Sequence, residues 1–250
     1  MKRTISARVG RGSVNHNTRK FHAKNTDPER SHLNITYCEE NIKAVYHELF
    51  DEALALYNSK QTRADRKIKD YYEKIRASKQ EKTFHEIILQ VGNKDDMHTG
   101  SDEGSLAVEI LEEYMAGFRE RNPQLSVFSA HLHMDEATPH LHIDFIPFTT
   151  GSKRGLETRV SLKQALAAQG FQGGSRGDTE WNQWVRSEKD QLSLVMQRHG
   201  IEWEKKDTHE KHLSVLDYKK EQRTKEIAAL ETVKAEKESE VAEQEQRLSE

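Results

Sequence analysis

The sequence predicts an α+β fold, in which helices pack against an antiparallel β-sheet, followed by a charged C-terminal helix. Short aliphatic stretches typical of strands alternate with stretches of helical periodicity, in the order strand, helix, strand, strand, helix, helix. Most aliphatic clusters fall between residues 84 and 203, so a core of normal density can form there although 32% of the chain is charged. We therefore expect a folded domain over residues 1–207 and the start of a helical or coiled-coil region over 208–250.

The elements of the N-terminal third are predicted from periodicity and turn residues. Residues 1–37 lack helical periodicity and are rich in Gly and Asn, which favours short strands and loops. Residues 39–80 carry apolar side chains at helical intervals, with a basic break from Lys60 to Arg66 that divides them into two helices. Residues 84–91 are short, aliphatic and closed by Gly92, as in a buried strand.

The later elements follow from the same signals. An amphipathic helix is expected over 106–119 and ends before Pro123. Strands are expected over 126–133 and 140–148, and helices over 161–168 and 181–199. The polar loops are expected at 93–104, 151–155 and 170–177. Beyond Thr208 a heptad keeps its phase, but charged residues interrupt its seam, so it makes a poor coiled coil.

Composition and charge restrict the class of protein. The single cysteine, Cys38, excludes an internal disulfide and favours a reducing compartment. No apolar run approaches the roughly 18 residues of a membrane span, and no secretory signal is present, so we expect a cytoplasmic protein. The net charge is −3, yet the first 34 residues hold eight cations and two anions, which suits a nucleic-acid partner.

The densest functional signal is a histidine-rich hairpin between residues 131 and 142. Side chains two apart on a strand share a face, so His131 pairs with His133 and His140 with His142. Pairing of the two strands would gather all four rings beside Asp135 and Glu136, in the turn that Pro139 closes. Converging imidazoles with open positions form a divalent-metal site. The alternative is a row of solvent-facing histidines, and spacing leaves open which three would bind.

Three short motifs in order resemble a known family. The sequence from His133 to His142 is similar to the HxDExxPHxH motif of the MobV plasmid mobilisation relaxases, or Pre/Mob proteins, which are HUH endonucleases. Residues 16–19 resemble that family's HNxR motif, and residues 25–34 its NxDPxRxxxN motif. The resemblance covers roughly residues 1–215 and reaches only the start of the family's coiled-coil region.

The resemblance implies a metal site made by His133, His140 and His142. Glu136 would be a neighbouring supporting or base residue, and His131 an extra histidine of undecided role. The implied cofactor is a divalent ion, Mn²⁺ or Mg²⁺, with Zn²⁺ possible in a purified sample.

The resemblance also implies the chemistry. A relaxase nicks one strand of DNA and keeps the 5′-phosphate as a covalent adduct, and the family's nucleophile aligns with His16. Tyr37 and Tyr46 are the alternatives, and His22 is a nearby decoy. Arg19 would hold a phosphate.

The predicted DNA contacts come from the basic and polar segments. They comprise Asn17, which could also orient His16, and Arg11, Arg30, Asn34, Lys153, Arg154 and Arg176. Arg30 could instead form a salt bridge with an acidic neighbour, and Asn34 could brace the site. The implied partners are single-stranded and hairpin DNA of an origin of transfer, a second copy through the C-terminal helix, and the transfer machinery. The other function classes left open are a non-catalytic metal-containing DNA-binding protein and a metallonuclease that uses water.

Overall fold

The computed structural model describes residues 1–10 and 12–205, and positions 220, 223–224, 226–228, 230–235 and 237–238. The chain divides into two units, Met1–Lys205 and Lys206–Glu250. The sequence had suggested a boundary at residue 207. In the second unit the described positions are helical and exposed. Four heptad positions of the expected coiled coil lie outside the described residues: Leu213, Leu216, Val241 and Leu248.

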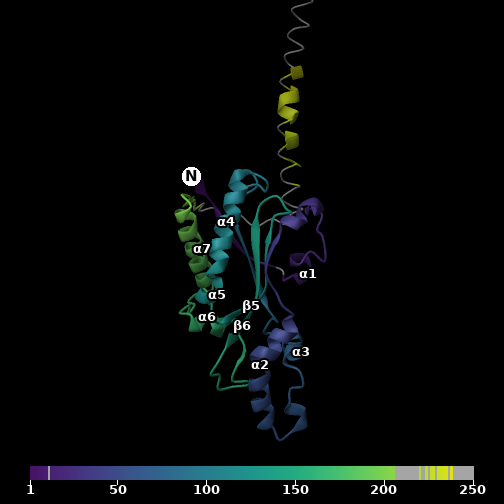
Figure 1. The fold of residues 1–250 in the computed structure, drawn as a ribbon, viewed down its shortest axis with the longest axis vertical. Coiled ribbons are helices and arrows are strands. Elements are labelled where there is room, and N and C mark those ends of the chain that lie inside the picture. The colour runs from purple at the N-terminus through teal and green to yellow at the C-terminus, as the bar shows by residue number, and fades with distance from the viewer. Residues whose placement is uncertain are drawn as a thin grey trace, which may run out of the picture. The chain divides into compact units, whose positions relative to one another are not determined.

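An antiparallel sheet forms the centre of the first unit (Figure 1). Its order is β2-β4-β6-β5-β3, and β7 pairs with β6. The strands are β2 (Ile5–Val9), β3 (Ile35–Glu39), β4 (His85–Val91), β5 (Leu125–His133), β6 (His140–Thr149) and β7 (Arg159–Val160). A separate parallel pair joins β1 (Lys2–Arg3) to β8 (Glu202–Trp203). The predicted fold class is confirmed.

One face of this sheet is apolar and covered by helices. These are α4 (Asp102–Ala116), α5 (Phe118–Arg121), α6 (Leu162–Ala168) and α7 (Glu180–Arg198). The alternation along each strand sends Leu89, Leu141 and Ile143 to this side, where none is exposed to solvent. They pack with Tyr114, Trp184 and their neighbours in the main core, which joins the sheet to the helices.

The opposite face is divided between two kinds of surface. At one end α2 (Ile42–Ser59) and α3 (Tyr71–Arg76) pack on Phe128 and Ile146 and form a second apolar core. The 3₁₀ helix Ala64–Arg66 lies in the connection between them. At the other end the short helix α1 (Val14–Asn17) and the 3₁₀ helix Pro28–Leu33 lie against polar strand residues. In Figure 1, α1 lies on the opposite side of the sheet from α4 and α7.

The structure corrects some expected elements. The helix expected over 106–119 begins at Asp102, because the Ser101 side chain caps the amide of Gly104, and it is interrupted at Gly117. Helices cover both faces of the sheet, because α2 and α3 lie on part of the face opposite the main core. Residues 1–37 contain the expected short strands, and also the unforeseen helix α1. No described helix combines the length and apolar character that a membrane crossing requires.

Candidate metal centre and nucleophile

The histidine hairpin pairs in the register that its spacing predicts. His133 lies opposite His140 across β5 and β6, and His131 lies opposite His142. The ring centroid of His133 is 4.5 Å from that of His142 and 5.3 Å from that of His140. The rings of His140 and His142 are 5.0 Å apart. Three imidazoles therefore gather at the end of the sheet.

Hydrogen bonds fix which nitrogen of each ring is free. Nε2 of His133 is 2.8 Å from the carbonyl oxygen of Asn17, and Nδ1 of His140 is 2.8 Å from that of Thr138. Nδ1 of His142 is 2.6 Å from a carboxylate oxygen of Glu86. Each of these nitrogens faces an acceptor and so carries the hydrogen, which leaves a lone pair on the other nitrogen of the ring.

Two of these lone pairs belong to buried atoms without a protein partner. Within the described chain, Nδ1 of His133 and Nε2 of His142 have no hydrogen-bond partner. Burial lowers the pKa of both rings, and so keeps them neutral. Metal-ligating histidines are held in this way, with one nitrogen donating to the protein and the other directed at the ion. The donor set therefore fits a divalent cation.

His131 lies apart from this group. It is 3% exposed, and its two ring nitrogens lie 3.1 Å from the hydroxyls of Thr36 and Ser129. Both nitrogens are thus engaged by side chains of β3 and β5. The extra histidine of the hairpin is a buried link between strands.

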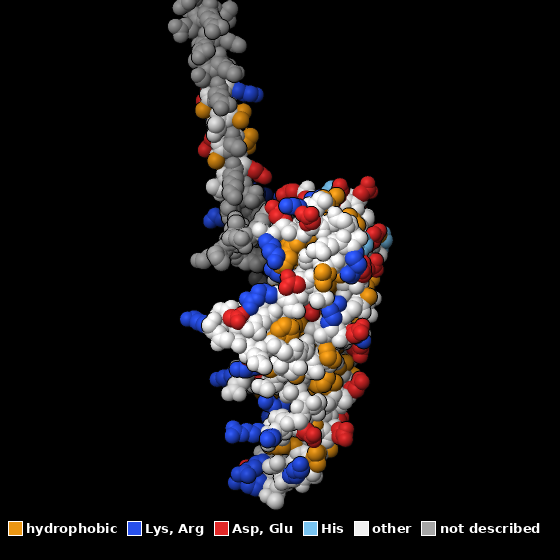
Figure 2. Space-filling model, turned by 90° about the vertical axis from the view of Figure 1, so that its left-hand side faces the viewer, with side chains coloured by type: hydrophobic (Ala, Val, Ile, Leu, Met, Phe, Trp, Pro, Cys, Tyr) orange, Lys and Arg blue, Asp and Glu red, His pale blue; other side chains and the backbone are white. Residues whose placement is uncertain are grey.

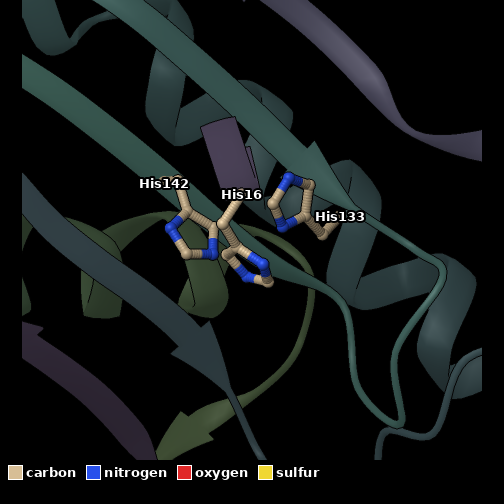
Figure 3. Close-up of side chains that lie close together, drawn as sticks. All are labelled: His16, His133 and His142. Atoms are coloured by element: carbon tan, nitrogen blue, oxygen red, sulfur yellow. The ribbon is translucent and has the colours of Figure 1, made fainter. Parts of the chain in front are cut away.

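His16 approaches the cluster from α1 (Figure 3). Its ring centroid is 5.7 Å from His133 and 5.9 Å from His142. Two sets of potential ligand atoms lie within 4.8 Å of one another: His16, His133 and His142, and His133, Glu136 and His140. Geometry alone therefore allows His16 two roles, an attacking group beside the metal or a ligand. Burial, and then the charge of Arg19, lower the pKa of His16, while Glu136 opposes them.

Arg19 links His16 to the acidic turn of the hairpin. Its Nε donates to Asp135 over 2.8 Å and its Nη2 donates to Glu136 over 3.1 Å, while Nη1 lies 3.3 Å from Nε2 of His16. The Arg19 backbone has φ +56°, the left-handed region that residues other than glycine rarely adopt. Such a conformation persists where surrounding contacts impose it, here the contacts with Asp135 and Glu136. In this arrangement the guanidinium contacts the two acidic side chains and also the His16 ring.

Asp135 is the centre of a brace made by the 25–34 segment. It is fully buried, and one of its carboxylate oxygens also accepts from Ser31 at 2.7 Å and from Asn34 at 2.8 Å. Burial opposes ionisation, but hydrogen bonds from Arg19, Ser31 and Asn34 lower the pKa of Asp135. Asn34 also accepts from the amide of Met134, over 2.7 Å. This second motif holds the hairpin turn.

Glu136 lies between His16 and His140. Its Oε1 is 3.6 Å from Nε2 of His16 and 3.9 Å from Nε2 of His140. Its other oxygen accepts from Asn25 over 2.5 Å. The hydrogen bond from Asn25 therefore holds the carboxylate beside the His16 ring.

Several expected DNA contacts have positions that argue against that role at this site. Asn17 is 2% exposed, and its amide donates to Glu86 at 2.8 Å and to Asp144 at 2.9 Å, so it joins elements of the fold. The amide of Asn34 donates to Asp135 in the hairpin turn, as described above. Arg30 forms an i,i+3 ion pair with Asp27 at 2.8 Å, the alternative that the sequence had left open.

The remaining predicted contacts lie away from the histidines. Lys153 and Arg154 follow the end of β6 that is distant from His140, about 30 Å along the strand. Arg176 is in the loop between α6 and α7, on the helix-covered side of the sheet. Arg11 lies outside the described residues.

The alternative tyrosine nucleophiles are also remote. Tyr37 packs against the main core, and burial raises its pKa. Tyr46 is 2% exposed in the second core, where its hydroxyl donates to the carbonyl of Thr83 and burial raises its pKa. Neither phenol belongs to the histidine cluster, which leaves His16 as the side chain that faces it from the N-terminal segment.

Sequence reasoning missed two buried carboxylates beneath the site. Glu86 on β4 is 3% exposed and Asp144 on β6 is fully buried. Burial, and then the charge of Glu86, raise the pKa of Asp144 to about 7, against hydrogen bonds from Asn17 and Ser129. The available signal was a charged residue inside an aliphatic strand, on the same face as the histidines.

Solved structures with this architecture are relaxase domains. One is the Mn-bound MobM relaxase domain (MOBV; Mob_Pre) with a 22-nucleotide oriT DNA of plasmid pMV158 at pH 5.5. It has a TM-score of 0.51 and 24% identity, and the match covers 87% of this chain and 98% of that one. The same domain with a 3′-thiophosphate DNA at pH 6.8 gives a TM-score of 0.50, 23% identity, and 87% and 98% coverage. At these identities the likeness is one of fold, and the class of the chain is that of a relaxase-type α+β domain.

Family membership follows from the sequence itself. The family model described as plasmid recombination enzyme, Mob_Pre, matches residues 17–220. The chain belongs to this family, as the three motifs predicted. A plasmid recombination enzyme of Streptococcus agalactiae is 25% identical over 228 residues, or 86% of this chain. The chain spans 37% of the length of that relative.

Proposed function

We propose that the protein is a metal-dependent DNA relaxase. It would nick one strand at the origin of transfer of a plasmid or mobile element, keep the 5′-phosphate on His16, and rejoin the strand to end mobilisation. The observation that carries this proposal is the cluster of imidazole lone pairs beside the His16 ring. Family membership and the relaxase fold support it.

Each residue of the site would have a separate role in the cleavage reaction. His133, His140 and His142 would hold a divalent ion, Mn²⁺ or Mg²⁺, which supplies a positive charge for the oxygens of the scissile phosphate. A nitrogen of His16 forms the bond to phosphorus while the bond to the 3′-oxygen breaks, and the released 3′-oxygen takes up a proton. Glu136, 3.6 Å from His16, balances the positive charge that develops on the ring. Arg19 fixes Glu136 and faces the nucleophile.

The end of the domain that carries α2 and α3 is basic. Residues 60–82 hold nine cations and four anions. Lys and Arg side chains gather at the lower left of Figure 2, at the end of the unit that Figure 1 shows to carry α2 and α3. The loop with Lys153 and Arg154 belongs to the same end, because Leu156 and Val160 pack in the second core. We propose that this basic end binds phosphates of the origin hairpin or its flank.

The single strand could then be held close to α1. Phe21, two residues after Arg19, is 60% exposed. Exposed aromatic rings stack on unpaired bases and contribute about 1–3 kcal/mol per base. We propose Phe21 as such a contact, which the sequence reasoning did not single out.

The other candidate chemistry uses His16 as a ligand. In that case His16, His133 and His142 would hold the metal, and water activated by Glu136 would cleave the DNA without a protein adduct. The two mechanisms differ in what becomes of the 5′-phosphate and in what His16 contributes to metal affinity.

The test compares His16→Ala with His22→Ala, an exposed histidine six residues further on. An origin oligonucleotide whose end label lies on the 3′ product is incubated with Mn²⁺ and run on a denaturing gel. The nucleophile assignment predicts a labelled protein band with wild type and His22→Ala and none with His16→Ala, which should still bind Mn²⁺. Cleavage without any protein adduct, together with lost Mn²⁺ binding in His16→Ala, would favour the water mechanism.

A further inference from the structure

One buried carboxylate contacts both halves of the site. Glu86, 3% exposed on β4, accepts from Nδ1 of His142 at 2.6 Å and from the Asn17 amide at 2.8 Å, both through Oε1. Its Oε2 accepts from the backbone amide of Gly12 at 2.7 Å. Gly12 and Asn17 lie on either side of His16 in the chain. A single side chain therefore holds a metal ligand and the segment that carries the nucleophile.

The three donors require an acceptor without hydrogens. An ionised carboxylate only accepts, whereas an amide of the same shape would direct its NH₂ group at one or more of these donors. The bond to Glu86 also keeps the hydrogen of His142 on Nδ1, and so leaves the Nε2 lone pair for a metal. The charge of Glu86 thus determines the tautomer of His142 and the anchoring of α1 together.

The backbone at Gly10 passes close to the carboxylate. The amide of Gly10 donates to the carbonyl of Glu86 at 3.0 Å. A Cβ atom placed on Gly10 would lie 1.8 Å from Oε2 of Glu86, far inside contact distance. Strand β2 therefore ends directly over the side chain and confines it between β4 and α1.

We propose that Glu86 is a positioning residue that couples metal binding to placement of the nucleophile. An ion that binds Nε2 of His142 strengthens the bond between Nδ1 and Glu86, and the same carboxylate holds Gly12 and Asn17 on either side of His16. Binding of the metal therefore orders the His16 segment. The inference rests on the proposed function, since it assumes a metal at His142 and an attacking group at His16.

The chain supplies a matched control in Glu188. This residue is also 3% exposed, on α7, where it accepts hydrogen bonds from Asn122 at 3.0 Å and from Tyr114, and pairs with Arg121 at 3.2 Å. It lies on the helix-covered side of the sheet and contacts none of the histidines. Its replacement disturbs a buried carboxylate network without touching the site.

The experiment measures Mn²⁺ affinity by calorimetry and amide hydrogen exchange of residues 12–19, with and without Mn²⁺, on the full chain. In wild type, Mn²⁺ should slow exchange in this segment. Glu86→Gln should weaken Mn²⁺ binding by about 10- to 100-fold, the usual effect of losing a partner of a ligating histidine. It should also speed exchange in metal-free protein and remove the effect of saturating Mn²⁺. Glu188→Gln should leave both readouts at wild-type values even where it lowers Tm.

A second variant covers poor folding of Glu86→Gln. Asn17→Leu removes the amide that joins α1 to Glu86 and leaves the backbone carbonyl that His133 contacts. It should bind Mn²⁺ and show a reduced protection of residues 12–19 by the metal. The inference would be overturned, and the proposed function would stand, if Mn²⁺ affinity and amide exchange stayed unchanged in both variants. The same conclusion would follow if both quantities changed equally in Glu188→Gln. A wild-type chain that does not bind Mn²⁺ through His133 and His142 would overturn the proposed function as well.

Discussion

The two faces of the central sheet differ in how they use buried residues, although the same strands supply both. On β4, Ile87 and Leu89 enter the main core. The residue before Ile87, Glu86, is buried on the other face of the sheet and faces the histidines. On β6, Leu141 and Ile143 alternate with His142 and Asp144, and all four are buried. On the apolar face, burial itself stabilises the fold. On the polar face each buried group needs a specific partner, so geometry is fixed at the expense of stability.

This difference teaches where each class of substitution should act. A change on the apolar face should alter the free energy of unfolding and spare the chemistry at low temperature. A change on the polar face should alter metal binding or cleavage more than stability. The predictions that follow test this separation with neighbouring or matched residues.

The largest effect is expected from two consecutive residues of β6. His142→Ala should reduce nicking by at least about 10³-fold, because it removes a proposed metal ligand and one of the three donors to Glu86. Ile143→Ala should destabilise the fold by about 2–5 kcal/mol, through a cavity in the main core. Cleavage assays below the Tm of both variants, paired with urea titrations, measure the two effects. Equal loss of cleavage in both variants would break the comparison.

A smaller effect concerns His85, which stacks on Phe145 and contacts Trp181 on the apolar face. Burial, and then the charge of Lys82, lower its pKa to about 4 from an ordinary 6.5. Because the folded pKa is lowered, the unfolded chain takes up the proton first, and stability present above pH 6.5 is lost as the pH falls towards 4. His85→Phe should reduce that acid loss by about 2 kcal/mol.

The measurement for His85 is a urea titration series from pH 7.5 to 4.5 with a metal chelator present. His47→Phe on the exposed side of α2 serves as the control for replacing a histidine by phenylalanine outside the core. Parallel curves for wild type and His85→Phe would show that the stacked ring does not contribute.

The smallest effect is expected from the basic end. Replacing the exposed Lys67, Lys69 and Lys79 by alanine should weaken binding of origin hairpin DNA by about 10-fold at low salt. The slope of log affinity against log salt should fall by up to about 3, since each phosphate contact contributes roughly 0.9. Removing the exposed cations Lys163, Arg176 and Arg186 on the helix-covered side should change neither quantity. Fluorescence anisotropy of labelled hairpin DNA across a salt series measures the affinity and the salt slope for both sets of substitutions.

How much could be predicted from sequence depended on the range of the interactions. The histidine cluster was predictable, because strand periodicity and a short turn are local and determine the register of β5 and β6. The α+β class followed from the same periodicity. Helix α1 was not predictable, since its four residues carry no helical pattern and are held by Asn17 contacts to β4 and β6.

The positions of the charged residues show the same limit. Arg30 and Asn34 were found as motif residues, but only the fold shows that Asn34 holds the hairpin turn, 101 residues away along the chain. Lys153 and Arg154 were predicted as DNA contacts, and the length of β6 separates them from His140. The role of Glu86 depends on contacts with residues 56 and 69 positions away, which no local pattern reports.

The close passage of Gly10 over Glu86 has a consequence for genetics. A screen for chains that fold but no longer support mobilisation should recover substitutions at Gly10, because any side chain there must displace the Glu86 carboxylate. Such alleles would retain every histidine of the three motifs. A motif search would therefore classify them as intact, and natural variants at this glycine would be inactive copies that look functional by sequence.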